Sequence, residues 1–179
     1  MQDSKNLVWM DMEMTGLDPE IHTIVEIATV ITDSSLKIIA EGPSLAVHQP
    51  EEVLKNMEAW SAKHHEASGL TKRVRESKIT MAEAEAQTLA FIQRYCPEKI
   101  TPLCGSSIHQ DRRFLVRYMP KIHHYLHYRM IDVSSVKELV SRWFPFGPRP
   151  PAKADSHLAM ADIKESIGEL LFYREHYFK

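Results

Sequence analysis

Two apolar runs near the start of the chain predict two buried strands. Residues 7–12 (LVWMDM) are mostly apolar, and residues 24–32 (IVEIATVIT) are rich in the β-branched residues that favour extended structure. A turn-forming sequence at 15–19 separates them. Residues 36–40 and 44–48 predict a third strand, interrupted by a Gly-Pro pair. Three consecutive strands joined by short loops favour an antiparallel start to the sheet.

The apolar spacing then becomes helical, first at Val53, Met57 and Trp60 and later over residues 81–95. Thr80, with a glutamate three residues after it, predicts a capping box at the start of the longer helix. The rest of the chain alternates strands and helices. It predicts strands at 102–105 and 128–133, helices from about 109 to before 120, at 134–143 and at 156–176, and a proline-rich loop at 145–151. This order indicates an α/β fold with one mixed sheet.

Length, composition and charge limit the possible functions. The chain has 179 residues, of which 44% are hydrophobic, so residues 1–179 are expected to form a single domain. Twenty-two Lys and Arg against 24 Asp and Glu give a net charge of −2. That balance excludes the global positive field with which proteins hold long nucleic acids. Any nucleic-acid ligand is expected to be short or gripped locally.

Two cysteines and the absence of long apolar runs indicate the compartment. Cys96 and Cys104 form no CxxC pair and cannot make a four-ligand zinc site alone, so we expect reduced thiols. The N-terminal residues show no signal-like segment, and no apolar run reaches the ~18 residues that a membrane span requires. The protein is expected to be cytoplasmic, with no membrane partner.

An acidic pair closes the first predicted strand. Asp11 and Glu13 lie two residues apart and therefore project to one face, at the end of the strand where α/β sheets commonly place their sites. Two such carboxylates repel each other unless a cation lies between them, and their hard oxygens suit Mg²⁺ or Mn²⁺. Taken alone, the pair is also typical of solvated acids at a strand end.

Three further residues extend this pair. Asp111 falls in the first turn of a predicted helix, where an acid is favourable even without a metal. Asp162 lies on the last predicted helix beside an apolar stripe, where an unpaired acid is costly. His157 precedes Asp162 by five residues, or ~500° of helix, so the two share no face if both are mid-helix. The histidine is therefore expected at the helix start.

The order and spacing of Asp11-x-Glu13, Asp111 and His157-x₄-Asp162 resemble the DEDDh exonucleases, whose ribonuclease H-like fold has a mixed five-stranded sheet flanked by helices. The chain also contains WMDMEMTGLD at 9–18, AEGP at 40–43, SGLT at 68–71, QDRRFL at 110–115, YMP at 118–120 and HYR at 127–129. With these segments it is similar, more narrowly, to the oligoribonuclease family from about residue 6 to residue 179.

The resemblance implies a metal-dependent phosphodiesterase. Asp11, Glu13, Asp111 and Asp162 would hold two divalent ions, Mg²⁺ or Mn²⁺, that clamp the scissile phosphate. His157 would be the general base, because a pKa near ~6.5 suits that task at neutral pH. The implied activity is 3′→5′ hydrolysis of RNA of two to five nucleotides, especially dinucleotides, to 5′-mononucleotides.

The resemblance also implies residues that hold the bases. Leu17 matches an apolar wedge between bases, and His65 matches a residue near the 3′ end. Beside them, the ring of Trp60 could stack on a base. Each has a structural reading as well. Leu17 and Trp60 could pack in the core, and His65 could belong to a solvated polar cluster.

The 5′ side of the substrate is implied to involve two groups of residues. Ser107 and Ser134 match positions that cap a 5′ phosphate, although Ser134 is also readable as a helix N-cap. Tyr128 and Arg129 match a segment that comes from the second subunit of a homodimer, and arginine suits phosphate through its planar fork.

Two alternatives and two departures accompany this interpretation. A proofreading or RNA-trimming relative would act on longer 3′ ends, but the basic runs at 72–75 and 112–113 are short for that purpose. A non-catalytic nucleic-acid-binding module of the same fold would not need all five catalytic residue types. The chain has Ser106 where the family is expected to have Asn, and its loop at 145–151 also differs from expectation.

Overall fold

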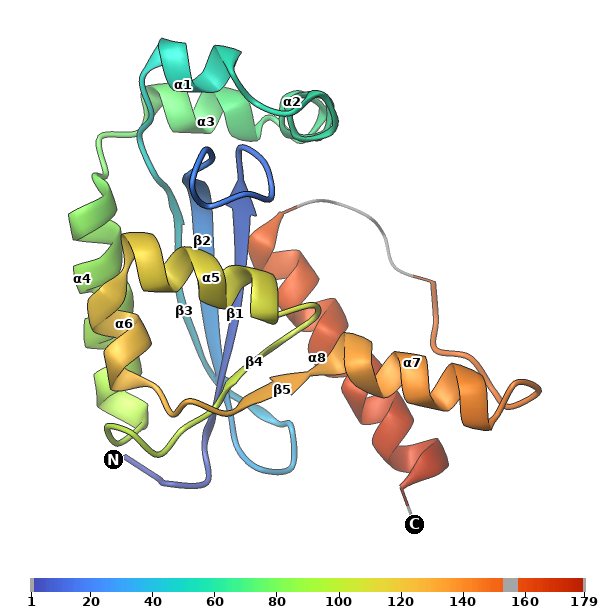
Figure 1. The fold of residues 1–179 in the computed structure, drawn as a ribbon. Coiled ribbons are helices and arrows are strands. Elements are labelled where there is room, and N and C mark those ends of the chain that lie inside the picture. Colours follow the sequence, from blue (N-terminus) through green and yellow to red (C-terminus); the bar gives the residue numbers. More distant parts are fainter. Residues whose placement is uncertain (1, 153–157, 179) are drawn as a thin grey trace.

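A computed structural model describes residues 2–152 and 158–178 of the chain. Five strands form one sheet in the order β3-β2-β1-β4-β5 (Figure 1). Their bounds are β1 Leu7–Met14, β2 Ile24–Thr32, β3 Ile38–Ala46, β4 Leu103–Gly105 and β5 Met130–Asp132. The first three strands pair antiparallel, whereas β4 runs parallel to β1 and β5 runs parallel to β4. The predicted mixed five-stranded sheet is confirmed.

Helices cover both faces of this sheet and one of its ends (Figure 1). Their bounds are α1 Glu51–Lys55, α2 Ala59–Ala67, α3 Leu70–Glu76, α4 Met81–Tyr95, α5 His109–Tyr118, α6 Pro120–Tyr125, α7 Val133–Trp143 and α8 Ala159–Tyr177. One core cluster joins β1 to α4, α5 and α6, and a second joins the opposite face to α7 and α8. The short helices α1 to α3 lie near the end of the sheet where β1 stops.

The alternation of side chains along β1 decides which layer its acids meet. Val8, Met10 and Met12 are buried in the cluster with α4, α5 and α6, whereas Trp9 is buried in the cluster with α8. Asp11 and Glu13 follow Trp9 by two and four residues, so their side chains project to the same face of the sheet, which α8 covers. The central strand thus delivers its two carboxylates to the face that α8 covers.

The predicted interruption of the third strand is present as an irregularity within one strand. β3 runs through Gly42 and Pro43, but neither residue has a partner in the ladder with β2, whose register shifts between Ala28 and Val30. Proline is tolerated because β3 is an edge strand, where a missing amide donor need not break a ladder. A Cβ at Gly42 would lie 2.5 Å from the ring of Phe91, which explains why this position carries no side chain.

Some helical boundaries also differ from expectation. The helical spacing at Val53, Met57 and Trp60 does not mark a single helix. α1 ends at Lys55 and α2 begins at Ala59, so Met57 lies between the two helices. Helices α3 and α6 were not predicted. They are short, and tertiary packing rather than periodicity defines them. The last helix begins at Ala159, and the first residues of its predicted range lie outside the described residues.

The state of the cysteines and the character of the helices concern the chain as a whole. Cys96 and Cys104 are free and buried, as expected of reduced thiols. Across residues 2–152 and 158–178, no helix combines the length and the apolar character needed to cross a membrane.

The predicted capping box on α4 is present, and its removal should have a measurable cost. The hydroxyl of Thr80 accepts from the amide of Glu83 at 3.2 Å, and the Glu83 carboxylate accepts from the amide of Thr80 at 2.8 Å. We expect Thr80→Ala to lower the free energy of unfolding by about 1 kcal/mol, measured by chemical denaturation. Thr80→Ser keeps the oxygen and should match the wild type. Equal stability of all three proteins would show that the box contributes nothing.

Candidate active site

Three carboxylates from two elements meet at the C-terminal end of β1. Asp11 and Glu13 come from the strand, and Asp162 comes from the first turn of α8. One oxygen of each lies within 4.8 Å of the others, and all three side chains are partly buried. The structure therefore brings together residues that are about 150 positions apart in the chain. Oxygen ligands at this spacing fit a hard divalent cation such as Mg²⁺ or Mn²⁺.

Asp111 approaches this cluster from the other side of the strand. It lies in the first turn of α5 and is buried. Its Oδ1 accepts a hydrogen bond from the backbone amide of Met12 at 2.9 Å, between the two strand acids. Asp111 is therefore both a fourth acid beside the site and a link that fixes α5 to the end of β1.

The acids raise one another's affinity for protons. Burial, followed by the charges of Asp111 and Glu13, raises the pKa of Asp11 well above its ordinary value. Burial, followed by the charges of Asp162 and Glu26, raises the pKa of Glu13 from 4.5 to about 8. Like charges held together in a poorly hydrated place favour protonation unless a cation compensates them. The donor set and its electrostatics thus fit a divalent metal.

Glu26 is a residue of the site that the sequence interpretation missed. Its side chain is 1% exposed, and its two oxygens face different elements. One accepts from Arg73 of α3 at 2.6 Å, and the other accepts from the amide of Ala159 at 3.2 Å. Glu26 therefore holds the start of α8, three residues before Asp162. The available signal was a single charged residue within the otherwise uncharged run of residues 24–32.

His65 supports the end of β1 from α2. The ring is 1% exposed, its Nε2 lies 2.9 Å from the carbonyl oxygen of Met14, and its Nδ1 lies 3.8 Å from Glu13 Oε2. The alternative of a solvated polar cluster is therefore wrong for His65. Its position between the strand backbone and a cluster carboxylate is suited to orienting Glu13.

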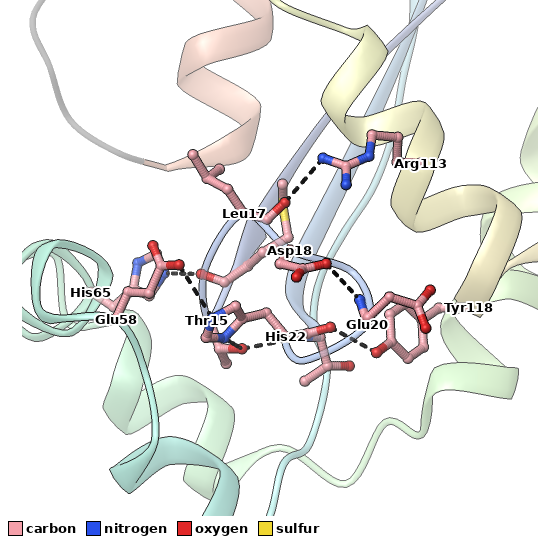
Figure 2. Close-up of polar contacts among 11 residues, drawn as sticks. Thr15, Leu17, Asp18, Glu20, His22, Glu58, His65, Arg113 and Tyr118 are labelled. Atoms are coloured by element: carbon pink, nitrogen blue, oxygen red, sulfur yellow. Dashed lines mark hydrogen bonds and ion pairs between the residues drawn. The ribbon is translucent and has the colours of Figure 1, made fainter.

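A groove opens beside the acidic cluster, between the β1–β2 turn and α2. It has a volume of about 340 Å³, and its lining residues are Met12, Glu13, Met14, Gly16, Leu17, Glu58, Trp60 and Ser61. Leu17 is 57% exposed and Trp60 is 58% exposed, so the core alternative is wrong for both. The Trp60 ring stacks on His64, with their centroids 3.9 Å apart. Figure 2 shows Leu17 on the turn that borders this groove, with its carbonyl accepting from Arg113.

The two predicted phosphate-capping serines lie together. The amide of Ser107 donates to Ser134 Oγ at 2.9 Å and to Asp132 Oδ1 at 2.8 Å. The reading of Ser134 as an N-cap is wrong, because Asp132 caps α7 by accepting from the Ser134 amide. Ser106, at the position where asparagine is expected, lies 2.8 Å from Ser166 between their hydroxyl oxygens. Its side chain thus links the end of β4 to α8.

Tyr128 and Arg129 do not reach the acidic cluster of their own chain. The parallel registers align Met130 with Leu103 and Leu103 with Val8. Tyr128 and Arg129 therefore precede β5 at the amino ends of these strands, whereas the strand acids lie at the carboxyl end of β1. Both side chains are exposed, and the Arg129 guanidinium lies 5.6 Å from the centre of the Tyr128 ring. His157 lies outside the described residues.

Comparison with known proteins gives close relatives over the whole chain. The sequence model of the exonuclease family matches residues 8–170. The oligoribonuclease of Pseudomonas aeruginosa is 55% identical over 179 residues, which cover 100% of this chain and 99% of the relative. The oligoribonuclease of Pseudomonas syringae pv. tomato is 57% identical, with the same coverage.

Solved structures with the same fold are larger and more distant in sequence. Exonuclease I from Methylocaldum szegediense has a TM-score of 0.72 and 19% identity, with 97% of this chain and 41% of that chain covered. Exonuclease I of E. coli in complex with a dT13 oligonucleotide has a TM-score of 0.73 and 16% identity, with 96% and 41% covered. The chain thus spans about two fifths of these enzymes. The likeness establishes the ribonuclease H-like exonuclease fold.

The raised pKa values make the metal-free protein sensitive to pH. Glu13 has a folded pKa of about 8, above the ~4.3 of an unfolded glutamate. Between these values the folded state binds more protons, so its free energy of unfolding should fall as pH rises. We expect thermal unfolding in EDTA to shift to lower temperature from about pH 5 to about pH 8, and added Mn²⁺ to reverse the shift.

Glu13→Gln provides the matched control, because it retains every histidine but not the perturbed carboxyl. Its unfolding temperature should depend less on pH than that of the wild type. Across this pH range, its free energy of unfolding should change by about 1–3 kcal/mol less than that of the wild type. Parallel curves for the two proteins would contradict the assignment of a retained proton to Glu13.

Proposed function

Since the chain belongs to the exonuclease family and is a 3′→5′ exoribonuclease, we propose that it degrades RNA of two to five nucleotides, especially dinucleotides, to 5′-mononucleotides. The observation that carries this proposal is the acidic cluster of Asp11, Glu13 and Asp162 beside a short groove. A groove of about 340 Å³ suits a terminal base rather than a long strand. The oligoribonuclease relatives support the same substrate class.

The chain depends on divalent metal, as its family membership and acidic cluster imply. We propose that Asp11, Glu13, Asp111 and Asp162 hold two such ions, Mg²⁺ or Mn²⁺. Ions bound there supply positive charge to the attacking and leaving oxygens. The four carboxylates fit this role because a bound cation relieves their mutual repulsion while they remain ionised.

The surrounding residues keep the cluster in place during the reaction. Asp111 fixes the Met12 backbone, His65 contacts the end of β1, and Glu26 holds the start of α8. These contacts restrict the positions that the carboxylates can adopt. We assign His157 as the general base that takes a proton from the attacking water, because it lies five residues before Asp162 in the sequence. Attack of that water breaks the last phosphodiester bond and leaves a 3′ hydroxyl on the shortened RNA.

Both ends of the substrate are bound in this proposal. Leu17 and Trp60 hold the base at the 3′ end, where an aromatic ring can stack on any base. Ser107 and Ser134 hold the 5′ phosphate, aided by Tyr128 and Arg129 of the partner subunit in a homodimer. The exposure of this pair at the opposite ends of the strands agrees with such a role. Closing both ends explains how a chain of net charge −2 binds RNA.

Cleavage of RNAs of different length tests the proposal. We expect a 5′-labelled dinucleotide to be hydrolysed faster than RNAs of three, five and twenty nucleotides in Mn²⁺, with no cleavage in EDTA. Glu13→Gln and His157→Ala should each lose roughly 100-fold or more. Glu138→Gln, which changes an exposed glutamate of α7, is the matched control and should keep full activity. Preferential shortening of the twenty-mer would favour a longer-substrate exonuclease, and binding without cleavage would favour a non-catalytic module.

Subunit mixing tests the shared site separately. Arg129→Ala and Glu13→Gln should each be inactive on dinucleotides as pure proteins. In a co-expressed mixture, the site on the Arg129→Ala chain receives Arg129 of the partner subunit and is complete. We expect about a quarter of the wild-type activity, because half of the dimers are mixed and each has one complete site. A monomer by light scattering, or a mixture without activity, would exclude this arrangement.

A further inference from the structure

The turn between β1 and β2 is held in place by side chains from two directions. On one side, the hydroxyl of Tyr118 lies 2.7 Å from the carbonyl oxygen of His22 and 3.0 Å from that of Pro19. On the same side, Arg113 donates to the carbonyl of Leu17 at 3.3 Å. These contacts come from α5 and hold the backbone of the turn (Figure 2). None of these three contacts involves α2, which forms the other wall of the groove.

His22 provides that second connection. Its ring is buried, with 8% of the residue exposed. Nδ1 lies 3.2 Å from the hydroxyl of Thr15, and Nε2 lies 3.2 Å from Glu58 Oε1 (Figure 2). A ring with its hydrogen on Nε2 satisfies both contacts, because it donates to Glu58 and accepts from Thr15. The Thr15 hydroxyl also accepts from the amide of Thr23 at 3.0 Å, so in this arrangement it acts both as donor and as acceptor.

Glu58 carries the connection to the base of α2. It is the residue that immediately precedes the helix, two positions before Trp60. Its backbone amide donates to the carbonyl of Thr15 at 2.9 Å. Backbone and side chain therefore both bind Glu58 to the turn that carries Leu17. We call Thr15, His22 and Glu58 together the His22 clamp.

The space beside the clamp shows how closely its parts pack. A Cβ at Gly16 would lie 2.5 Å from the His22 ring and 2.7 Å from the carboxyl carbon of Glu58. Such distances are too short for any side chain, so only glycine fits between Thr15 and Leu17. The carboxylate of Glu58 also lines the groove.

We propose that His22 and Glu58 are positioning residues that set the separation of Leu17 and Trp60, and so determine how tightly the terminal base is bound. This inference rests on the proposed function, in which Leu17 and Trp60 hold the 3′ base. Neither His22 nor Glu58 belongs to the acidic cluster. Their loss should therefore weaken substrate binding and leave the chemical step almost unchanged.

Steady-state kinetics on a dinucleotide test the clamp. We expect His22→Ala and Glu58→Ala to raise KM by roughly tenfold and to change kcat by less than about twofold. The KM of the double variant should be no higher than that of the more damaged single variant, because each single substitution already removes the same interaction. His22→Gln, which can donate and accept in the same place, should restore much of the lost affinity. Glu58 is half exposed, so its variant remains informative if His22→Ala folds poorly.

Two controls separate the clamp from a general disturbance of the turn. Glu20→Ala removes the ion pair with Arg117 on the outside of the same turn, where both groups are substantially exposed, and should keep the wild-type KM. The second control is a dinucleotide that lacks its 3′ base. On that substrate, the KM of His22→Ala and of the wild type should differ by less than about twofold, because no base remains to be positioned.

The outcomes distinguish this inference from the proposed function. If the wild type does not cleave dinucleotides, the proposed function fails and the clamp fails with it. If it cleaves them but binds the abasic substrate as well as the normal one, the base-binding role of Leu17 and Trp60 fails, and the clamp fails with it. If the wild type depends on the 3′ base but both alanine variants keep its KM, the proposed function stands and the clamp is overturned. An equal KM increase on both substrates would likewise overturn it.

Discussion

The repulsion among acids at the end of β1 is the constraint on which the rest of the structure depends. Asp11, Glu13 and Asp162 approach within 4.8 Å although each carries the same charge when ionised. Placing like charges together in a partly buried site opposes folding, so the surrounding elements must hold them there. The fold takes these carboxylates from a central strand and a long helix, which pack against each other in one buried cluster.

Contacts around the cluster bind those elements at their ends. Glu26 joins the second strand to the start of α8, and Asp111 joins α5 to the backbone of β1. These residues are themselves acidic, so they add to the repulsion while providing the connections. A protein selected for stability alone would replace them with apolar groups. Their presence is understandable if the site is meant to be completed by positive charge.

The sequence predicted the parts of this arrangement that follow local rules. Strand alternation placed Asp11 and Glu13 on one face, and the capping box at Thr80 was visible from two residues. The path of β3 through Pro43 depended on its edge position, which no local pattern reveals. Trp60 looked like a core residue by its spacing, and its exposure depends on the break between α1 and α2. Glu26 was overlooked because its partners are distant in the chain and contact it only after folding.

The direction of the parallel strands explains why the proposed substrate contacts of Tyr128 and Arg129 require a second chain. Residues that precede β5 lie at the amino ends of the strands, whereas the acids lie at the carboxyl end of β1. No rotation of the Tyr128 or Arg129 side chain can span the length of a strand, at ~3.3 Å for each residue. A contribution from these two residues to catalysis must therefore come from a neighbouring molecule. In the proposed homodimer, a site closed in this way has two fixed ends, and the distance between them would limit the length of the RNA.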